Sequence, residues 1–497
     1  MSELELKFRI PDAALEPLRK ALRQHGAQRT RLQARYFDTA DGLLARHLIA
    51  LRLRLEGRRW VQTLKAAGSG AVHRLEDEVR VPGAPSTVPA LDLGLHEGSE
   101  AGAALQAALD SAPGAVLLER HATDVVRLHC LLQTEGGSAV EVALDTGRAM
   151  AGENSVPILE LELEHKGGPV QGLFDLSSAW VQHGGQWLCS ITKAERGQRL
   201  ILAQDPPAAP KHGRPKLAAT ADGATLMRAL LQSTLAQVLA AASEVAEDDT
   251  AADTIHRLRV ALRRLRTVLR ELSPLAAPSA APAARWDTAL AHTFSVLGQT
   301  RDQQAVTAAV QPLLQAAGAP RLQWRAPSTA DPATAVRDPV FQTVLVEILA
   351  LAHAGAQAFA ALSAEEVMAL LRGRLNKLHR EVCREGRHFE RLPIKRQHRV
   401  RKRLKRLRYL IDLTAALWPE RGARRELKRY LQRLSVAQAA LGQHNDVAVA
   451  AEAFREDAAA HPEAWFAAGW LLAHLAVTAR AARKTLVKVA AGPRFWA

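Results

Sequence analysis

The feature that most constrains this chain is a set of short segments in which charged and apolar residues alternate. In Glu3-Leu-Glu-Leu-Lys-Phe-Arg9, residues 3, 5, 7 and 9 share one face, because successive side chains of a β-strand point to opposite sides. Segments 51–55, 74–80, 140–145 and 159–164 repeat the pattern. The alternation predicts strands that each have one charged face and one apolar face.

Half-exposed strands with their polar faces in water would account for any one of these segments. Their recurrence within one region favours a closed barrel, in which helices cover the apolar faces and the charged faces line the lumen. A lumen with so many carboxylates and cations needs a ligand that balances the charge. Polyphosphate with divalent cations meets this need, because Mg²⁺ binds carboxylate and phosphate oxygens while Arg and Lys bind the remaining phosphate oxygens.

The two halves of the sequence differ in charge and texture. Residues 1–203 contain 23 basic and 25 acidic residues, whereas residues 204–497 contain 43 and 26. The back half is also rich in Ala, Leu and Arg at helical spacing, and aromatic residues make up only 4% of the chain. We therefore expect a near-neutral first domain and a basic helical domain that binds a polyanion.

A proline-rich segment separates these halves. Residues 205–216 hold four prolines and can continue neither a helix nor a central strand. The predicted organisation is a first domain at 1–203, a linker at 204–216 and a helical domain at 217–497, whose two repeats span about 220–340 and 341–495.

Cysteine usage and hydropathy indicate the compartment. Cys130, Cys189 and Cys383 are too widely spaced for a zinc site or a disulfide framework, which favours a reducing cytoplasm. Charged residues at positions 3, 5 and 7 argue against a signal peptide. The longest apolar stretch, 464–479, is shorter than the roughly 20 residues of a spanning helix and is expected to be buried. We expect a cytoplasmic protein without a membrane partner; association with polyphosphate granules is left open.

The front half resembles a known family. Glu3-x-Glu5-x-Lys7 is similar to the ExExK signature of the CYTH family of triphosphate tunnel metalloenzymes. Companion residues follow in the family's order over about 200 residues: Arg52 and Arg54, Thr63 and Lys65, Glu76 and Glu78, Arg127, Glu141 and Asp145, the 159–164 strand, and Lys193-Ala-Glu-Arg196-Gly. One departure is Cys130, three residues after Arg127, at a position where relatives often have Trp.

The resemblance implies an eight-stranded antiparallel barrel that acts on triphosphates with Mg²⁺ or Mn²⁺. The implied metal ligands are Glu3, Glu5, Glu162 and Glu164, with Glu141 and Asp145 as further ligands, and Glu76 and Glu78 either as ligands or as residues that position water. The implied phosphate clamps are Lys7, Arg52, Arg54, Lys65, Arg127, Lys193 and Arg196.

The implied activity is metal-dependent hydrolysis of inorganic triphosphate. Phosphoryl transfer relies on positioning and charge neutralisation, so no catalytic Ser, Cys or His is required. The sequence has no GxxxxGK loop, which argues against a P-loop enzyme. Thiamine triphosphate hydrolysis, nucleoside triphosphate hydrolysis and adenylate cyclisation remain alternatives in the same tunnel, and so does a binding protein without catalysis.

The back half contains an internal repeat. The segment His256-Arg-Leu-Arg-Val-Ala-Leu-Arg-Arg-Leu-Arg266 aligns with 398–408, and Leu297-Gly-Gln-Thr-Arg-Asp302 aligns with 441–446. Helical spacing places a His and three cations on one stripe in each copy. The two stripes are His256, Arg259, Arg263 and Arg266, and His398, Arg401, Lys405 and Arg408.

A charged helix face is usually only solvated, but its recurrence with a His in both copies favours a binding role. The pattern resembles the CHAD domain, which implies two pseudo-symmetric helical bundles and binding of inorganic polyphosphate. The histidines are expected to donate to phosphate, because no metal-ligating residues accompany them at ligand spacing. Nucleic acid is a disfavoured alternative partner. The expected fold class is thus α+β multidomain, an antiparallel β tunnel followed by an all-α double bundle.

Overall fold

The computed structural model describes the backbone of residues 2–67, 73–201, 215, 217–280, 284–319 and 331–496. Side chains are described over the same ranges, except at residues 2, 3, 73, 74, 183, 280, 299–305 and 307. The chain divides into two compact units. The barrel unit comprises Met1–Gly213, Leu235–Asp249 and Val336–Ala354, and the helical unit comprises Arg214–Thr234, Thr250–Ala335 and Gly355–Ala497. Only Pro215 of the predicted linker at 204–216 is described, so that boundary stays a prediction.

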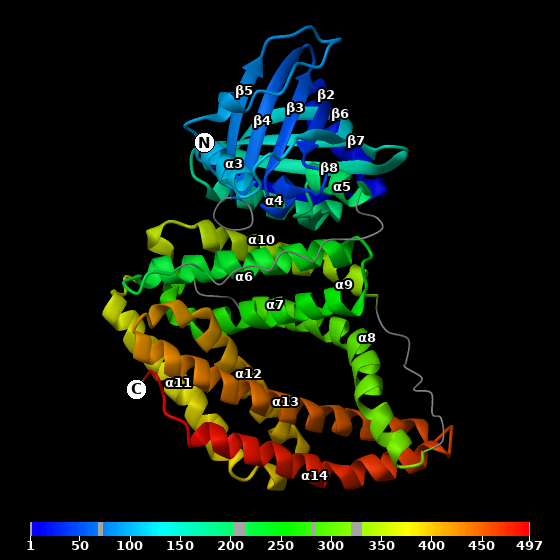
Figure 1. The fold of residues 1–497 in the computed structure, drawn as a ribbon, viewed down its shortest axis with the longest axis vertical. Coiled ribbons are helices and arrows are strands. Elements are labelled where there is room, and N and C mark those ends of the chain that lie inside the picture. Colours follow the sequence, from blue (N-terminus) through cyan, green and yellow to red (C-terminus); the bar gives the residue numbers. More distant parts are fainter. Residues whose placement is uncertain are drawn as a thin grey trace. The chain divides into compact units, whose positions relative to one another are not determined.

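The barrel unit is built on one antiparallel sheet with the strand order β5-β4-β3-β2-β6-β7-β8-β1-β9 (Figure 1). The strands are β1 (Ser2–Arg9), β2 (Gln28–Asp38), β3 (Ala50–Glu56), β4 (Arg59–Ala67), β5 (His73–Val81), β6 (Leu118–Gln133), β7 (Ala139–Ala151), β8 (Asn154–Gly167) and β9 (Trp187–Leu188).

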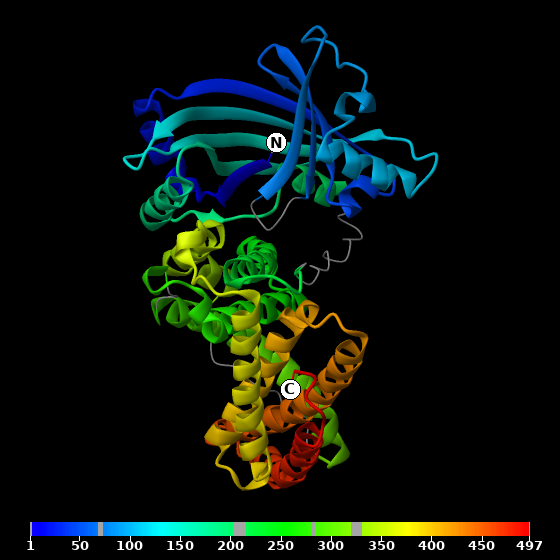
Figure 2. The ribbon, with the colours of Figure 1, turned by 90° about the vertical axis from the view of Figure 1, so that its left-hand side faces the viewer.

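β1 closes this sheet into a barrel. Residues 2–4 of β1 pair with β5, whereas residues 5–9 pair with β8. Figure 2 shows the long strands curving around the unit. The predicted antiparallel tunnel is confirmed, but the sheet has nine strands rather than eight, because the short β9 pairs with Phe8 and Arg9 at the end of β1.

Helices pack on the apolar outer faces of the barrel. α3 covers β4 and β5, and α4 covers β7 and β8, whereas α5 contacts β6, β7 and β8 on the lumen side, where its Lys193 lines the cavity. The helices of this unit are α1 (Leu15–Gln24), α2 (Leu43–Arg46), α3 (Glu100–Asp110), α4 (Gln171–Gly184), α5 (Lys193–Ile201), the end of α6 (Gly223–Ala246) and α10 (Pro339–His353).

One part of the lumen is apolar rather than charged. Val125, Ala149 and Ile158 continue the lumen-facing register beyond the charged positions of β6, β7 and β8. They form a buried cluster with Leu32 of β2 and Leu200 of α5. This apolar cluster therefore fills one part of the lumen, and the charged residues occupy the rest.

The helical unit confirms the predicted all-helical back half (Figure 1). Its helices are the start of α6, α7 (Ala252–Glu271), α8 (Ala284–Ala316), most of α9 (Pro332–Arg337), α11 (Ala364–Gly386), α12 (Ile394–Leu413), α13 (Arg421–Asp457) and α14 (Ala464–Ala490). The two repeated motifs fall on matching elements, because α7 and α12 are each 20 residues long and each is followed by a long helix, α8 or α13.

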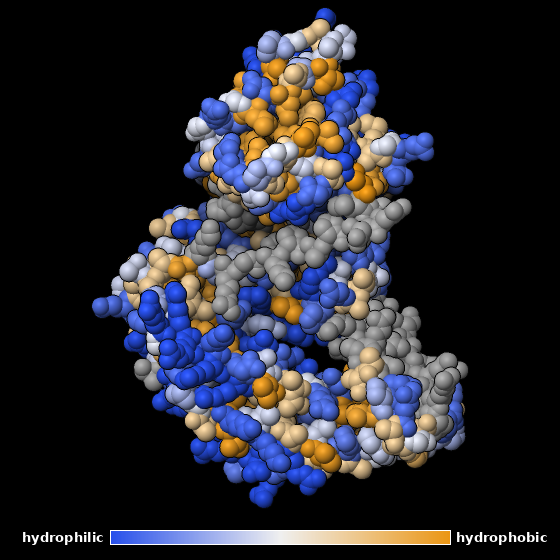
Figure 3. All heavy atoms as spheres, viewed as in Figure 1, coloured by the Kyte–Doolittle hydropathy of each residue, from blue (hydrophilic) through white to orange (hydrophobic). Residues whose placement is uncertain are grey.

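The helical unit is largely hydrophilic on the face shown in Figure 3, over the region of α11, α12 and α13. α14 carries the apolar stretch 464–479, and only one of its faces is buried: Ala467 and Leu471 are buried, whereas Trp465 is 55% exposed. Among the described helices only α6 is long and apolar enough to cross a membrane, and 61% of its apolar window is buried, as in a core helix.

Candidate functional site: a charged tunnel and a cationic helix pair

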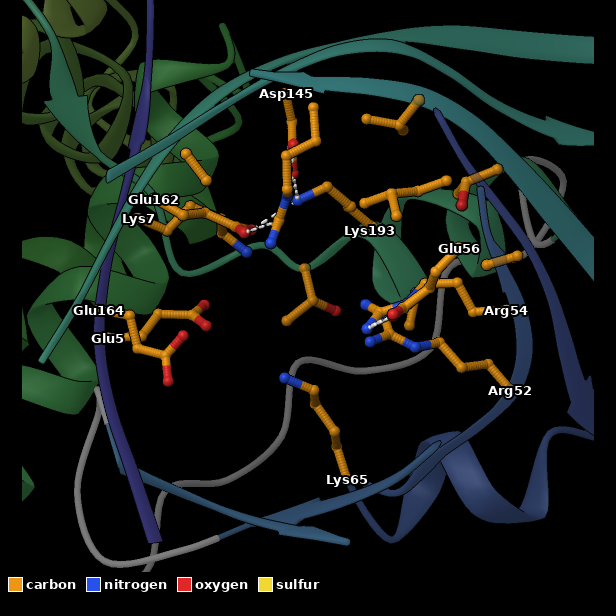
Figure 4. A pocket seen from close by; sticks show the side chains of 18 of the residues that line it. Glu5, Lys7, Arg52, Arg54, Glu56, Lys65, Asp145, Glu162, Glu164 and Lys193 are labelled. Carbon is orange, nitrogen blue, oxygen red and sulfur yellow. Dashed lines mark hydrogen bonds and ion pairs between the residues drawn. The ribbon is translucent and has the colours of Figure 1, made fainter. Parts of the chain in front are cut away.

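The barrel encloses a cavity of about 440 Å³ lined by charged side chains. Most of the predicted tunnel residues line it: Glu5, Lys7, Arg52, Arg54, Lys65, Glu76, Glu78, Arg127, Glu141, Asp145, Glu162, Glu164 and Lys193. The side chain of Glu3 lies outside the described residues. In Figure 4, Glu5 and Glu164 lie across the cavity from Arg52 and Arg54, with Lys65 between them.

Three carboxylates form a row across neighbouring strands. Glu5 of β1 is paired in register with Glu164 of β8, which is paired on its other side with Glu141 of β7. Burial raises the pKa of Glu164, and the nearby Glu141 and Glu5 charges raise it further, although Lys166 opposes the shift. Lys166 Nζ lies 2.6 Å from Glu164 and 3.5 Å from Glu141. Among the residues that the structure describes, Lys166 is the lysine paired with this carboxylate row, and His129 lies 3.4 Å from Glu141, so the three carboxylates carry more negative charge than Lys166 balances.

A tight ionic cluster lies next to the carboxylate row. Arg127 donates two hydrogen bonds to Asp145, at 2.8 and 2.7 Å, and also contacts Glu162. Lys193 Nζ lies 2.8 Å from Asp145 and 2.5 Å from Glu162. Burial alone would raise the pKa of Glu162, but Lys193, Arg127 and Lys7 outweigh it and hold that pKa well below its usual value. This ionic cluster therefore stays charged in the tunnel.

The opposite wall holds three cations, Arg52, Arg54 and Lys65, each beside a glutamate. Arg52 and Arg54 are two residues apart on β3 and share the lumen face. Burial and the neighbouring Arg52 charge lower the pKa of Arg54. Glu78 Oε1 lies 3.1 Å from Arg54 and 3.8 Å from Arg52. Lys65 pairs with Glu76 at 2.8 Å. An anion that enters the cavity can replace these glutamates as the ion-pair partner of the wall's cations.

Arg196 is not among the described lining residues of the cavity and lies behind Glu160. Its Nε donates to Glu160 at 2.8 Å, and Glu160 Oε2 lies 3.0 Å from Lys193. Burial would raise the pKa of Glu160, but Lys193, Lys7 and Arg196 lower it to about 2. The predicted clamp Arg196 is thus connected to Lys193 of the tunnel through the buried Glu160 carboxylate.

Gly197 explains how closely α5 approaches the barrel. A Cβ atom at Gly197 would lie 1.9 Å from Cδ2 of His121 on β6, so only glycine fits there. The His121 ring in turn stacks on Tyr36, with ring centroids 4.5 Å apart. The glycine that follows Arg196 therefore allows α5 to bring Lys193 and Arg196 to the tunnel.

Sequence reasoning missed several residues of the tunnel. Tyr36, Glu56, His129 and Lys166 also line the cavity. Tyr36 lies on β2, whose described lining residues Thr30, Leu32, Ala34 and Tyr36 are uncharged, so the criterion of an alternating charged face could not select it. Glu160 and Lys166 continue the alternation of the 159–164 strand, which was the signal available for both.

The donors of the carboxylate row fit a divalent cation. Mg²⁺ and Mn²⁺ bind carboxylate oxygens, and a cation would relieve the repulsion that raises the pKa of Glu164. Among the side chains that the structure describes, no three His, Cys, Asp or Glu groups already meet closely enough to form a complete site. Glu5, Glu164 and Glu141 would therefore supply part of the coordination, and phosphate oxygens or water would supply the rest.

The helical unit places the two predicted basic stripes together, because α7 packs against α12. The Arg259 and Arg263 guanidinium groups lie 4.9 and 4.8 Å from the centre of the Phe294 ring of α8. Arg259 is buried and donates to the Leu297 carbonyl at 3.1 Å. The repeated Leu-Gly-Gln motif thus fixes Arg259, since its Gly298 leaves room for the guanidinium.

Lys405 of α12 faces this cluster of arginines. Burial lowers its pKa, and the charges of Arg263, Arg401 and Arg259 lower it further, to about 6, while Asp446 opposes the shift. Lys402, one turn earlier, has its pKa lowered by burial and by Arg266. We refer to Arg259, Arg263, Arg401 and Lys405 as the cationic cluster.

The other predicted polyphosphate residues have local partners or lie at the edge of the cluster. Arg266 pairs with Asp287 at 2.9 Å, and Arg408 donates to Gln438 at 2.9 Å. His398 is exposed and lies 3.1 Å from Asn445 Oδ1, while His256 is half-buried. Sequence reasoning missed Lys402, which lies beside Arg401 in the motif but off the stripe.

Comparison with known proteins identifies two families. Residues 1–197 match the CYTH domain, and residues 229–455 match the CHAD domain. An inorganic triphosphatase from Haemophilus influenzae is 31% identical over 211 residues, which are 40% of this chain and 55% of that protein. The match thus spans about half the length of that curated relative.

Solved structures that match parts of this chain include proteins from Ricinus communis and Hippeastrum. The CHAD domain from Ricinus communis is 22% identical and covers 57% of this chain and 97% of its own, with a TM-score of 0.44. An adenylyl cyclase candidate from Hippeastrum with a dominant triphosphatase activity is 18% identical and covers 41% of this chain and 98% of its own, with a TM-score of 0.27.

Proposed function

Because the chain joins a CYTH domain to a CHAD domain, we propose that its barrel hydrolyses inorganic triphosphate and that its helical unit binds inorganic polyphosphate. The observation that carries the first part is the lining of the cavity, in which the carboxylate row lies across from Arg52, Arg54 and Lys65, three cations that are themselves paired with glutamates. A phosphate chain needs both groups, because its oxygens bind cationic side chains directly and bind carboxylates only through a metal ion.

The roles of the residues follow from their positions. Arg52, Arg54 and Lys65 hold phosphate oxygens from one side, and Lys7 and Lys193 do so from the other. Glu5, Glu164 and Glu141 hold Mg²⁺ or Mn²⁺, as the site's donor set allows. The bound ion would neutralise phosphate charge and lower the pKa of water. The protein's own contribution is to align the phosphate chain, which is the main requirement for phosphoryl transfer.

The lining favours an inorganic substrate over a nucleotide. Among the lining residues that the structure describes, Tyr36 is the single Phe, Tyr or Trp, and its ring is already stacked on His121. A nucleobase would therefore find little aromatic surface on which to stack.

A substrate panel tests the proposed hydrolase activity. We expect the full chain with Mg²⁺ or Mn²⁺ to release phosphate from tripolyphosphate faster than from ATP or thiamine triphosphate, and we expect EDTA to abolish release. Faster turnover of thiamine triphosphate or ATP, or formation of cyclic AMP, would assign the tunnel to one of those chemistries instead. No turnover of any of these substrates would leave a binding protein.

The cationic cluster supports polyphosphate as the partner of the helical unit. Lys405 has a pKa of about 6 because burial and three arginines disfavour its charge, and a polyanion would relieve this repulsion. Binding of long-chain polyphosphate by the full chain, measured in competition with duplex DNA at physiological salt, tests the proposal. We expect polyphosphate to bind more tightly; equal affinity would favour nucleic acid.

We further propose a cytoplasmic location. Cys130, Cys189 and Cys383 are all buried free thiols, which are compatible with a reducing compartment. Immunolocalisation in cells with and without polyphosphate granules would test both the compartment and the association with granules.

A further inference from the structure

Glu247 follows directly after α6, and in the compact division of the chain it belongs to the barrel unit. Its Oε1 accepts a hydrogen bond from Arg196 Nη2 at 2.6 Å and lies 3.6 Å from Arg9 Nε. Arg196 Nε donates to Glu160 at 2.8 Å. The guanidinium is therefore held between two carboxylates, one from β8 and one from a segment 51 residues further along the chain.

The ion pairs of Arg196 with Glu160 and Glu247 are largely shielded from water, which makes their loss costly. The Arg196 side chain is 7% exposed and that of Glu160 is fully buried, whereas Glu247 is 23% exposed. Burial would lower the pKa of Arg196, but Glu160 and Glu247 outweigh it and raise that pKa. If Arg196 lost one of its two carboxylate partners, its buried guanidinium would stay charged but would be only partly paired. The side chain would therefore move toward other hydrogen-bond acceptors.

A chain of contacts links Glu247 to the cavity. Glu160 binds Arg196 through Oε1 and approaches Lys193 through Oε2, at 3.0 Å. Lys193 lines the cavity and also contacts Asp145 and Glu162. Glu247 is thus connected to a lining cation through Arg196 and Glu160, although it is not among the described lining residues of the cavity.

The turn that carries Glu247 is fixed by its neighbours. Arg337 Nε donates to the Ala246 carbonyl at 2.8 Å, and Arg337 Nη2 lies 3.1 Å from Asp248. The same guanidinium lies 4.9 Å from the centre of the Trp187 ring of β9. Asp248 has a φ of 67°, a left-handed conformation that this turn requires. Glu247 is therefore held by contacts on both sides.

The stretch from β9 to α5 is hydrogen-bonded to α6 and α10. The Ser190 amide donates to Ser243 Oγ of α6 at 2.8 Å. The Leu188 amide donates to Gln342 Oε1 of α10, also at 2.8 Å. Because this stretch leads directly into α5, these bonds help to position the start of the helix that carries Lys193 and Arg196.

We propose that Glu247 is a positioning residue for the tunnel, which orients Arg196 and thereby Glu160 and Lys193. The functional barrel would then require the end of α6 and would extend beyond the first 203 residues. This inference rests on the proposed triphosphatase function of the tunnel.

Full-length Glu247→Ala and Glu247→Gln variants test this role. On the triphosphate that the wild type hydrolyses fastest, we expect Glu247→Ala to lower kcat about tenfold and to change KM by less than threefold. Glu247→Gln should recover part of the loss, since its amide oxygen can still accept from Arg196. A loss of stability would also lower the apparent kcat without changing KM, because it reduces the folded fraction. The kcat of each variant is therefore calculated per folded protein, with the folded fraction measured by circular dichroism.

Glu244→Ala is the matched control, because it removes a carboxylate from the last turn of α6 that pairs with Arg199 at 3.6 Å. Equal kcat values for Glu247→Ala and Glu244→Ala would overturn the proposal, as would equal kcat values for Glu247→Gln and Glu247→Ala. If the wild type hydrolyses no triphosphate, the proposed function fails. Calorimetric affinity for tripolyphosphate then decides the role of Glu247, since the inference requires Glu247→Ala to bind more weakly than Glu244→Ala.

Discussion

The tunnel and the cationic cluster both gather positive charge, but they balance it differently. In the tunnel, Arg127 and Lys193 each lie within 3 Å of carboxylate oxygens from β7 or β8. In the helical unit, Arg259 and Arg263 flank an aromatic ring, and Lys405 faces arginines with Asp446 as the opposing charge. The first region is a network of paired charges, whereas the second has an excess of one sign.

This difference predicts two modes of phosphate binding. A phosphate chain entering the tunnel must replace internal ion pairs, so its binding depends on a metal ion that occupies the carboxylates. A phosphate chain on the helical unit only relieves repulsion, so its binding needs no metal and depends strongly on salt. The predictions below test this contrast.

The largest effect is expected from Glu5→Gln, which removes one charge from the carboxylate row. Loss of metal affinity should forfeit several kcal/mol of transition-state stabilisation, or about 100-fold or more in phosphate release. Polyphosphate binding by the helical unit should not change. Glu153→Gln, at an exposed turn after β7, is the control. Near-normal turnover of Glu5→Gln at saturating Mg²⁺ or Mn²⁺ would remove Glu5 from the site.

The second effect concerns the cationic cluster. The double change Arg263→Glu with Lys405→Glu should weaken polyphosphate binding about 30-fold at 0.15 M salt. For each phosphate contact that is lost, the polyphosphate keeps about 0.9 counterion that binding would otherwise release. The slope of log affinity against log salt should also become shallower by about 2.

The control for this double change is Arg480→Glu with Lys484→Glu, which reverses two exposed cations on α14. Fluorescence anisotropy with labelled polyphosphate measures both variants, and tripolyphosphate hydrolysis should be unaffected in each. A similar loss in both would show that only net charge matters.

The third effect is a pH dependence of polyphosphate binding. In the protein without polyphosphate, the pKa of Lys405 is about 6. A bound polyanion raises this pKa, so above about pH 6 the binding of polyphosphate is coupled to the uptake of a proton by Lys405. Affinity should therefore fall as pH rises, by at most about tenfold between pH 6.5 and 7.5. Lys405→Met should remove this component. An unchanged slope in Lys405→Met would show that another group takes up the proton.

The smallest effect is expected from Tyr36→Phe in the tunnel. Arg52 Nη1 lies 3.4 Å from the Tyr36 hydroxyl, a long hydrogen bond whose loss should change KM for triphosphate only about twofold. The ring would keep its stacking on His121. A fall in kcat of more than tenfold would indicate that the hydroxyl takes part in the reaction itself.

The sequence predicted the barrel because alternation of charge is visible without a structure. The same criterion cannot decide which face of a strand is internal. On β2 the charged residues Arg31 and Arg35 point outward and pair with Asp124 and Glu119, while Tyr36 lines the cavity. A charged face is therefore a strong indication of the lumen only when ligand-binding residue types recur on neighbouring strands.

Most of the tunnel residues could be named from the sequence because they lie on regular strands. Glu247 could not, since it is 51 residues from Arg196 and follows a helix without a motif of its own. The helical stripes were visible as a repeat, but the low pKa of Lys405 depends on burial between two helices. Spacing along one helix does not report that burial.

The pairing of β1 also sets an order of events during synthesis. β1 occupies residues 2–9 and completes its ladder only with β8, about 150 residues later. Contacts so distant in sequence form slowly, because a long loop must close before they gain any stability. The barrel unit also includes residues up to Ala354. On the ribosome, therefore, this unit cannot be completed until α7 and α8 have already emerged, and the two units must fold while their segments alternate along the nascent chain.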